Sequence, residues 1–263
     1  MTRPPVLPPC WRLVYCDTIA STNDEAKRLA RTGASERTIV WALEQTAGRG
    51  RRGRRWVSPR GNLYASLMLR PACSPEHAAR LGFATALAVG DALASLVLGL
   101  AGLACKWPND VLLGGRKIAG ILLESEIGRG PRSGPEAEIG GRESLAFLVI
   151  GVGINLAAAP HGAEFPATSL AAEGYSPPEP PAMLEAFVRC FDIWERRWRE
   201  EGFVPVRTAW LARATALGQP IEVRLENATM CGRFADLDQH GALVLETAQG
   251  PRLISAGDVF PAG

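Results

Sequence analysis

The sequence predicts a mixed domain of strands and helices followed by a small β-barrel. Up to about residue 214, short apolar segments with the character of strands are interspersed with longer stretches of helical character. From Thr215 the pattern changes, because short alternating segments separated by turn residues then fill about fifty residues, which is typical of a small barrel. We therefore expect a first domain over residues 1–214 and a second over residues 215–263.

Seven short segments of the first domain are largely apolar, as buried strands are. Gly114 and Gly115 form a turn between two of them, which predicts a hairpin. The stretch Gly128–Glu143 is rich in glycine, proline and arginine, and we expect an exposed loop there. The expected strands are Arg12–Cys16, Thr38–Glu44, Leu63–Arg70, Ala104–Trp107, Asp110–Leu113, Lys117–Glu126 and Phe147–Asn155.

Helical character is found in four places along the first domain. The first helix is short and begins near Thr22, which fits a capping box together with Glu25. The longest apolar run, Ala78–Ala104, contains Arg80 and Asp91, so we expect a buried helix and a turn rather than a membrane span. The longer helices are expected over Glu76–Leu98, Pro181–Glu201 and Val204–Ala214.

The composition is that of a soluble globular protein, with 47% hydrophobic and 21% charged residues. The formal net charge is only +2, so any basic site must be local. Prolines at positions 4, 5, 8 and 9 interrupt the apolar N-terminus, so we expect no signal peptide and a cytoplasmic protein. The six cysteines form no CxxC pair and the three histidines are far apart in the sequence, which argues against a zinc site, a disulfide framework and an imidazole-based triad.

Residues 48–55, with the sequence Gly-Arg-Gly-Arg-Arg-Gly-Arg-Arg, lie between two expected strands. Glycines at this density let backbone N–H groups approach an anion, and arginines supply permanently charged planar donors. We interpret the segment as a loop that binds phosphate or carboxylate and orders over a ligand; a nucleic-acid contact and a merely solvated loop are the alternatives. Trp56 follows the loop and is suited either to stacking on a ring or to anchoring the core.

A second polar segment, Lys106-Trp107-Pro108-Asn109-Asp110, combines an ammonium, an amide and a carboxylate at a strand junction. We interpret it as the floor of a polar site, although each residue taken singly also has an ordinary structural role. Lys117 stands at the start of an otherwise apolar strand, where its charge needs an anionic partner. We favour a ligand over a protein group as that partner.

Five motifs occur in an order and spacing that resembles biotin–protein ligases. No single motif is specific to this family, but the five motifs in this order are. The resemblance runs from about Leu13 to the C-terminus and includes the final barrel. The motifs are Ser21-Thr22-Asn23, Gln45–Arg54 (QTAGRGRRGR), Lys106–Asp110 (KWPND), Arg116–Leu122 (RKIAGIL) and Gly151–Asn155 (GVGIN).

The resemblance implies an α+β catalytic domain related to class II aminoacyl-tRNA synthetases, followed by an SH3-like barrel. The sequence is similar to the short form of the family, which lacks the helix-turn-helix domain. We therefore expect no DNA partner and no membrane partner. A monomer and a homodimer are both compatible with the sequence.

The same resemblance implies roles for individual residues. Lys117, which would contact the reacting carboxylate and phosphate, and Arg51 are the expected catalytic residues. Asp110 is a candidate for binding Mg²⁺ or the acceptor lysine. The residues expected against biotin are Ser21, Thr22, Asn23, Gln45, Gly120 and Gly151. The residues expected against the adenylate or its phosphate are Gly48, Arg49, Gly50, Arg51, Arg54, Trp56, Lys106, Asn109, Lys117 and Asn155.

The implied reaction has two steps and needs no protein nucleophile. The biotin carboxylate attacks the α-phosphate of ATP, giving biotinyl-5′-AMP and pyrophosphate, and Mg²⁺ is expected on the phosphates. A lysine of a biotin carboxyl carrier protein, that of acetyl-CoA carboxylase by the family's expectation, then displaces AMP. The alternatives are a lipoyl or octanoyl transferase of the same fold and, from a different class, a nucleic-acid-binding protein that uses the arginine loop.

Overall fold

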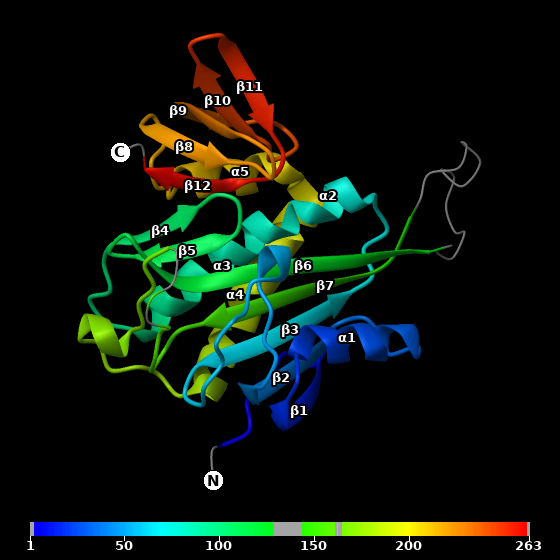
Figure 1. Cartoon of the computed structure of the whole chain (residues 1–263). Helices are drawn as coiled ribbons and strands as arrows, with labels where there is room; N and C mark the ends of the chain where they lie inside the picture. Colours follow the sequence, from blue (N-terminus) through cyan, green and yellow to red (C-terminus); the bar gives the residue numbers. More distant parts are fainter. Residues whose placement is uncertain (1–2, 129–143, 161, 163–164, 262–263) are drawn as a thin grey trace.

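Seven strands form the larger of two sheets, in the order β1-β2-β3-β7-β6-β5-β4 (Figure 1). This is a computed structural model that describes residues 3–128, 144–160, 162 and 165–261. β1 and β2 run parallel, and the other neighbouring strands run antiparallel. The bounds are Arg12–Ile19 (β1), Thr38–Gln45 (β2), Leu63–Leu69 (β3), Leu103–Lys106 (β4), Asp110–Leu113 (β5), Arg116–Gly128 (β6) and Ser144–Ile154 (β7).

All seven strands expected from the sequence are present, and most of their ends differ by one to three residues from the expected positions. The predicted hairpin through Gly114 and Gly115 is the turn between β5 and β6. Gly128 is the last residue of β6, and the rest of the loop predicted over Gly128–Glu143 lies outside the described residues.

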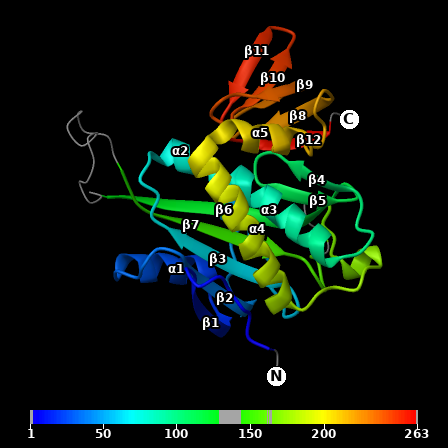
Figure 2. The ribbon, with the colours of Figure 1, turned by 180° about the vertical axis from the view of Figure 1, so that it is seen from behind.

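Helices cover both faces of this sheet because the strand side chains alternate between two apolar layers. On β2, Ile39 and Trp41 point into the main core, whereas Val40 between them faces α1. Helix α1 (Thr22–Arg31) packs on β2, β3 and β7, while α3 (Leu81–Leu96) and α4 (Pro180–Glu201) pack on the other side, as Figures 1 and 2 show from opposite directions.

The predicted long helix over Glu76–Leu98 consists of two segments, α2 (Pro75–Ala79) and α3, which meet at Arg80. By length and composition Pro75–Leu96 could cross a membrane. However, most residues of α3 are buried, because the helix lies between the sheet, α4 and α5 (Phe203–Leu211). A buried core helix can have the same length and hydropathy as a membrane-spanning one.

The start of α1 differs from the prediction in one respect. The N-cap is Ser21, not Thr22: Ser21 has an extended backbone, and its hydroxyl accepts a hydrogen bond from the backbone N–H of Asp24 at 3.4 Å. Both residue types make good caps, so the local sequence does not choose between them. The tertiary structure does, because the Thr22 hydroxyl is engaged by Gln45 across the pocket described below.

The second sheet has five antiparallel strands in the order β11-β10-β9-β8-β12, where the small barrel was expected. Trp107 ties it to the first domain through a hydrogen bond from its indole N–H to the carbonyl of Gly241, 3.1 Å away. The division at residue 214 remains a prediction. The strands are Pro220–Arg224 (β8), Thr229–Leu237 (β9), Leu243–Thr247 (β10), Gly250–Ile254 (β11) and Asp258–Pro261 (β12).

Trp210 offers a test of how this core is held together. Its side chain on α5 is 1% exposed, and its ring packs edge-on against Phe83 of α3 with 5.3 Å between centroids. Because the cavity left by a tryptophan is large, Trp210→Ala should lower the free energy of unfolding by about 3–5 kcal/mol, measured by urea denaturation. Leu98→Ala, at a side chain that is 99% exposed, should stay within about 0.5 kcal/mol of the parent. Equal effects of the two changes would contradict this description of the core.

Candidate active site

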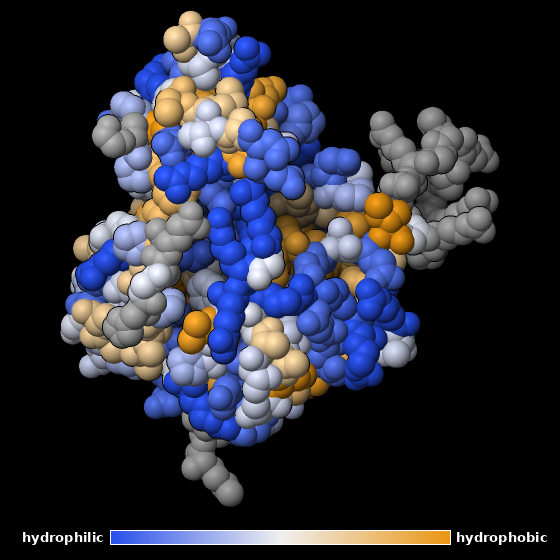
Figure 3. Space-filling model, viewed as in Figure 1, coloured by the Kyte–Doolittle hydropathy of each residue, from blue (hydrophilic) through white to orange (hydrophobic). Residues whose placement is uncertain are grey.

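A pocket opens where the larger sheet meets the C-terminal strands, and we call it the central pocket. Figure 3 shows hydrophilic residues gathered over the middle of this face, between the two sheets. Of the seventeen residues predicted for the site, only Gly48 does not line the pocket. The predicted residues that line it are Ser21, Thr22, Asn23, Gln45, Arg49, Gly50, Arg51, Arg54, Trp56, Lys106, Asn109, Asp110, Lys117, Gly120, Gly151 and Asn155.

One end of the central pocket is built from side-chain amides and hydroxyls held by fixed hydrogen bonds. The carbonyl oxygen of the Gln45 side chain accepts from the backbone N–H of Thr22 at 2.8 Å and from its hydroxyl at 3.0 Å. The Gln45 amide nitrogen donates to the hydroxyl of Ser58 at 3.0 Å. These partners fix which end of the amide is donor and which is acceptor, so Gln45 is preorganised.

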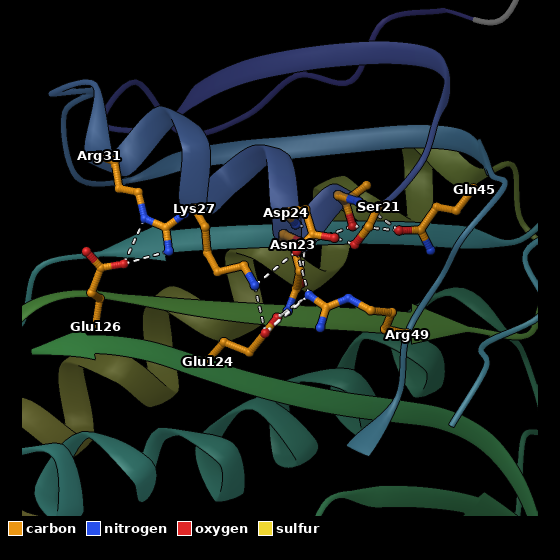
Figure 4. Close-up of polar contacts among 11 residues, drawn as sticks. Ser21, Asn23, Asp24, Lys27, Arg31, Gln45, Arg49, Glu124 and Glu126 are labelled. Carbon is orange, nitrogen blue, oxygen red and sulfur yellow. Dashed lines mark hydrogen bonds and ion pairs between the residues drawn. The ribbon is translucent and has the colours of Figure 1, made fainter. Parts of the chain in front are cut away.

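Asn23 is fixed in the same way and is 4% exposed. Its Oδ1 lies 2.6 Å from the hydroxyl of Ser66, and its Nδ2 donates to Glu124 at 2.8 Å (Figure 4). A Cβ atom at Gly151 would lie 2.1 Å from Asn23 Oδ1. Gly151 is therefore a glycine because the Asn23 side chain occupies the space that any other residue would need.

The middle of the pocket is a glycine floor under the Trp56 ring. A Cβ atom at Gly153 would lie 2.5 Å from the indole, and one at Gly120 would lie 2.9 Å from it. Lys117 Nζ lies over the same ring, 5.3 Å from its centroid. Trp56 Nε1 is buried and has no hydrogen-bond partner among the described residues. Trp56 thus lies within the site rather than in the main core.

The other end of the pocket is cationic. Lys117 Nζ lies 2.6 Å from the carboxylate of Asp110, and Lys106 Nζ lies 3.9 Å from it. Lys106 is 7% exposed, and burial lowers the pKa of its ammonium although Asp110 opposes that shift. We expected a ligand to be the partner of Lys117. Asp110 on the neighbouring strand β5 supplies a carboxylate partner, and contact of Lys117 with a ligand stays a prediction.

The arginine loop is held down by the C-terminal sheet. Arg52 and Arg54 contact the carboxylate of Asp258 on β12 at 3.1 and 2.5 Å. Arg51 donates to the side chain of Asn109 at 3.1 Å. Burial alone would raise the pKa of Asp258, but hydrogen bonding from Arg54 and the charges of the three arginines hold it below its usual range. Asp258 is therefore anionic at neutral pH and anchors the loop.

Gly48, the predicted residue that does not line the pocket, supports the base of this loop. Its carbonyl accepts a hydrogen bond from the backbone N–H of Trp56 at 2.9 Å. A Cβ atom at this position would lie 2.5 Å from the Trp56 carbonyl oxygen. Gly48 therefore shapes the base of the loop, and its contact with the adenylate stays a prediction.

Several residues that line the pocket were not predicted from the sequence, among them Pro160, Phe165, Ala167 and two residues of β12. Phe165 and Phe260 lie beside Lys106, whose Nζ is 4.2 and 5.6 Å from their ring centroids. Asp258 lines the pocket as well. These residues lie outside the five motifs, and only the tertiary structure brings them to the site.

Asn155 completes the cationic end and is buried. Its Nδ2 donates to the carbonyl of Thr168 at 3.0 Å. Its Oδ1 has no partner among the described residues, although it is buried at the wall of the pocket. A buried acceptor without a protein partner is costly unless water or a ligand supplies the donor, so Asn155 Oδ1 is free to accept a hydrogen bond from a bound molecule.

Comparisons with known proteins identify the family of this chain. The model of the biotin/lipoate A/B protein ligase family matches residues 15–133, and that of the biotin protein ligase C terminal domain matches residues 216–260. A biotin–[acetyl-CoA-carboxylase] ligase of Paracoccus denitrificans is 44% identical over 248 residues, which cover 92% of this chain and 98% of that protein. The chain belongs to the biotin protein ligase family. The bifunctional ligase/repressor BirA of Bacillus subtilis is 33% identical over 94% of this chain and 73% of its own length.

Solved structures of the family share the fold. The biotin protein ligase of Aquifex aeolicus in complex with biotin and ATP matches with a TM-score of 0.75 at 24% identity, over 95% of this chain and 97% of that one. The biotin protein ligase of Leishmania major in complex with biotinyl-5-AMP matches with a TM-score of 0.58 at 27% identity, over 95% of this chain and all of that one. The predicted family and its fold, with catalytic and C-terminal parts, are thereby confirmed.

The contact between the arginine loop and Asp258 can be tested without a substrate. Asp258→Asn removes the charge that holds Arg52 and Arg54, so trypsin should cleave within residues 49–55 several-fold faster, as judged by mass spectrometry of early fragments. Glu246→Gln is a matched control, because it also removes a carboxylate of this sheet, but one that is paired with Arg233 and not with an arginine of the loop. Equal cleavage of the two variants would show that Asp258 does not anchor the loop.

Proposed function

We propose that this chain activates biotin with ATP and transfers it to a lysine of a biotin carboxyl carrier protein. The observation that carries the proposal is the central pocket, in which fixed amides and a cationic end lie at two ends of one glycine floor. Family membership supports it, and so do the related ligases solved with biotin and ATP or with biotinyl-5-AMP. The name of the Paracoccus relative points to the carrier of acetyl-CoA carboxylase.

The amide end suits the ring of biotin. A ureido group has both donors and an acceptor, and Asn23, Thr22 and Gln45 offer complementary groups whose orientation is already fixed. Ile121, Leu122 and Val152 add the apolar walls that its thioether ring and aliphatic tail need. Small-molecule sites commonly combine such walls with a few well-placed polar anchors.

The cationic end suits the reacting groups. The biotin carboxylate oxygen attacks the α-phosphorus, and the bond to pyrophosphate breaks as the new acyl phosphate bond forms. Both reactants are anionic, so Lys117, Arg51 and Arg54 would offset their repulsion, which is the positioning and electrostatic assistance that such a reaction needs. In the second step the acceptor amine attacks the acyl carbon, and AMP leaves with the bond electrons.

The described residues do not offer a resident Mg²⁺ site. They contain no group of three carboxylate, histidine or cysteine side chains placed to hold a metal. Asp110, the candidate ligand, lies between the ammonium groups of Lys106 and Lys117, where a divalent cation would be repelled. Mg²⁺ would therefore reach the site with the ATP substrate.

The decisive experiment is exchange of labelled pyrophosphate into ATP, with biotin and separately with lipoate. Exchange that depends on biotin alone would establish the adenylating half-reaction. Exchange with lipoate alone would indicate that the chain activates lipoate and not biotin. No exchange with either acid, from folded protein, would refute the proposal.

Lys117 should contribute to adenylate formation. Lys117→Ala removes the ammonium beside Asp110 and the Trp56 ring, and the rate of biotin-dependent exchange should fall at least about tenfold, which corresponds to about 1.4 kcal/mol of transition-state stabilisation. Circular dichroism would verify the fold. An unchanged rate in a folded variant would remove Lys117 from the mechanism.

Arg51 should retain the adenylate. In Arg51→Gly the loop loses the guanidinium that reaches Asn109, so biotinyl-5′-AMP should escape and label lysines of bystander proteins. Streptavidin blotting of a mixture with serum albumin would detect this labelling. If parent and variant label albumin equally, Arg51 does not retain the intermediate.

A further inference from the structure

Glu124 on β6 lies outside the predicted site and does not line the central pocket, yet three groups converge on its carboxylate (Figure 4). Asn23 Nδ2 donates to it at 2.8 Å, Lys27 Nζ lies 2.8 Å away, and Arg49 Nη2 lies 3.0 Å away. Asn23 and Lys27 come from α1, whereas Arg49 belongs to the arginine loop. The carboxylate therefore joins the amide end of the pocket to the loop.

The charge of Glu124 decides which way the Asn23 amide faces. Burial alone would raise the pKa of Glu124, but hydrogen bonds from Lys27 and Asn23 and the charge of Arg49 hold it below its usual range. A carboxylate can only accept hydrogen bonds. It therefore holds the Asn23 amide nitrogen toward itself and leaves Oδ1 beside the hydroxyl of Ser66. The reversed amide would place two oxygens against each other.

The same carboxylate is a partner of the loop. Arg49 reaches across to α1 and β6, where it contacts Asp24 at 2.6 Å as well as Glu124. Lys27 bridges the same two acids, at 3.0 Å from Asp24. A group of alternating charges thus connects Asn23 with Arg49, both of which line the pocket.

We propose that Glu124 is a positioning residue for biotin, acting through the orientation of the Asn23 amide. This inference rests on the proposed function, since biotin is the ligand that Asn23 would receive. Glu124 itself does not touch the ligand. It keeps the donor and the acceptor of the Asn23 amide in the orientation that would bind the ureido group of biotin. Its second contact holds Arg49 next to Asn23.

Glu126 provides a matched control for this proposal. Glu126 lies two residues further along β6. Its carboxylate is paired with the guanidinium of Arg31 on α1, 2.7 Å away (Figure 4). Glu126→Gln therefore removes one negative charge and one ion pair to α1, as Glu124→Gln does, but the partner that it loses is Arg31 and not Asn23 or Arg49. A general effect of charge on α1 would appear in both variants.

The test is the dissociation constant of biotin, measured by isothermal titration calorimetry for the parent, Glu124→Gln and Glu126→Gln. Glu124→Gln should weaken biotin binding about tenfold, because a neutral amide no longer fixes the donor of Asn23. Glu126→Gln should stay within about twofold of the parent. In steady-state assays the KM for biotin should rise in Glu124→Gln by a larger factor than the KM for ATP, because Arg49 retains its contact with Asp24.

A double-mutant cycle separates positioning from mere structural support. In an Asn23→Ala background there is no amide to orient, so Glu124→Gln should add little to the loss of biotin affinity. Full additivity would overturn the proposal, as would parent-like affinity in Glu124→Gln. If Glu124→Gln does not fold, Glu124→Asp retains the charge while withdrawing the acceptor from Asn23, and it too should weaken biotin binding.

The outcomes also distinguish this proposal from the function on which it rests. A parent chain that does not bind biotin would refute both. A parent that binds biotin, with Glu124→Gln and Glu126→Gln both equal to it, would refute the role of Glu124 alone. Weakening in Glu124→Gln but not in Glu126→Gln, without additivity to Asn23→Ala, would establish that role.

Discussion

The site depends on the absence of side chains from one face of two paired strands. Gly120 of β6 lies directly opposite Gly153 of β7, and Gly151 is two residues away on the same face. Over these three positions lie Trp56 and Asn23, which belong to other elements. A methyl group at Gly153 or Gly151 would overlap with them. The pocket is therefore formed by backbone that side chains from the loop and from α1 approach closely.

Ion pairs then hold the lysines and arginines that surround this glycine floor. Three carboxylates, from different strands, each hold two or more cations near the pocket. Asp110 holds the two lysines at the cationic end, Asp258 holds arginines of the loop, and Glu124 holds Arg49 and Lys27 at the amide end. Paired in this way, the cations remain at the site and avoid the penalty of burying an isolated charge.

Much of the fold could be predicted because the strands have a local signature. Largely apolar segments predicted the seven strands of the larger sheet, and the five motifs contain every predicted residue that lines the central pocket except Trp56. The choice of Ser21 over Thr22 as the cap could not be predicted, because a tertiary partner of Thr22 decides it. Asp258 and Glu124 were missed for the same reason: each acts through a partner that is about 75 residues or more away in sequence, and no local pattern marks it.

The attachment of the arginine loop to the C-terminal sheet has a further physical consequence. Arg52 and Arg54 are partly exposed where they meet Asp258, and attraction between partly exposed charges is screened by dissolved ions. The contact of Arg52 and Arg54 with Asp258 is one between opposite charges. The fraction of molecules with the loop pinned against β12 should therefore decrease as ionic strength rises, so the salt content of the medium becomes a control on access to the pocket.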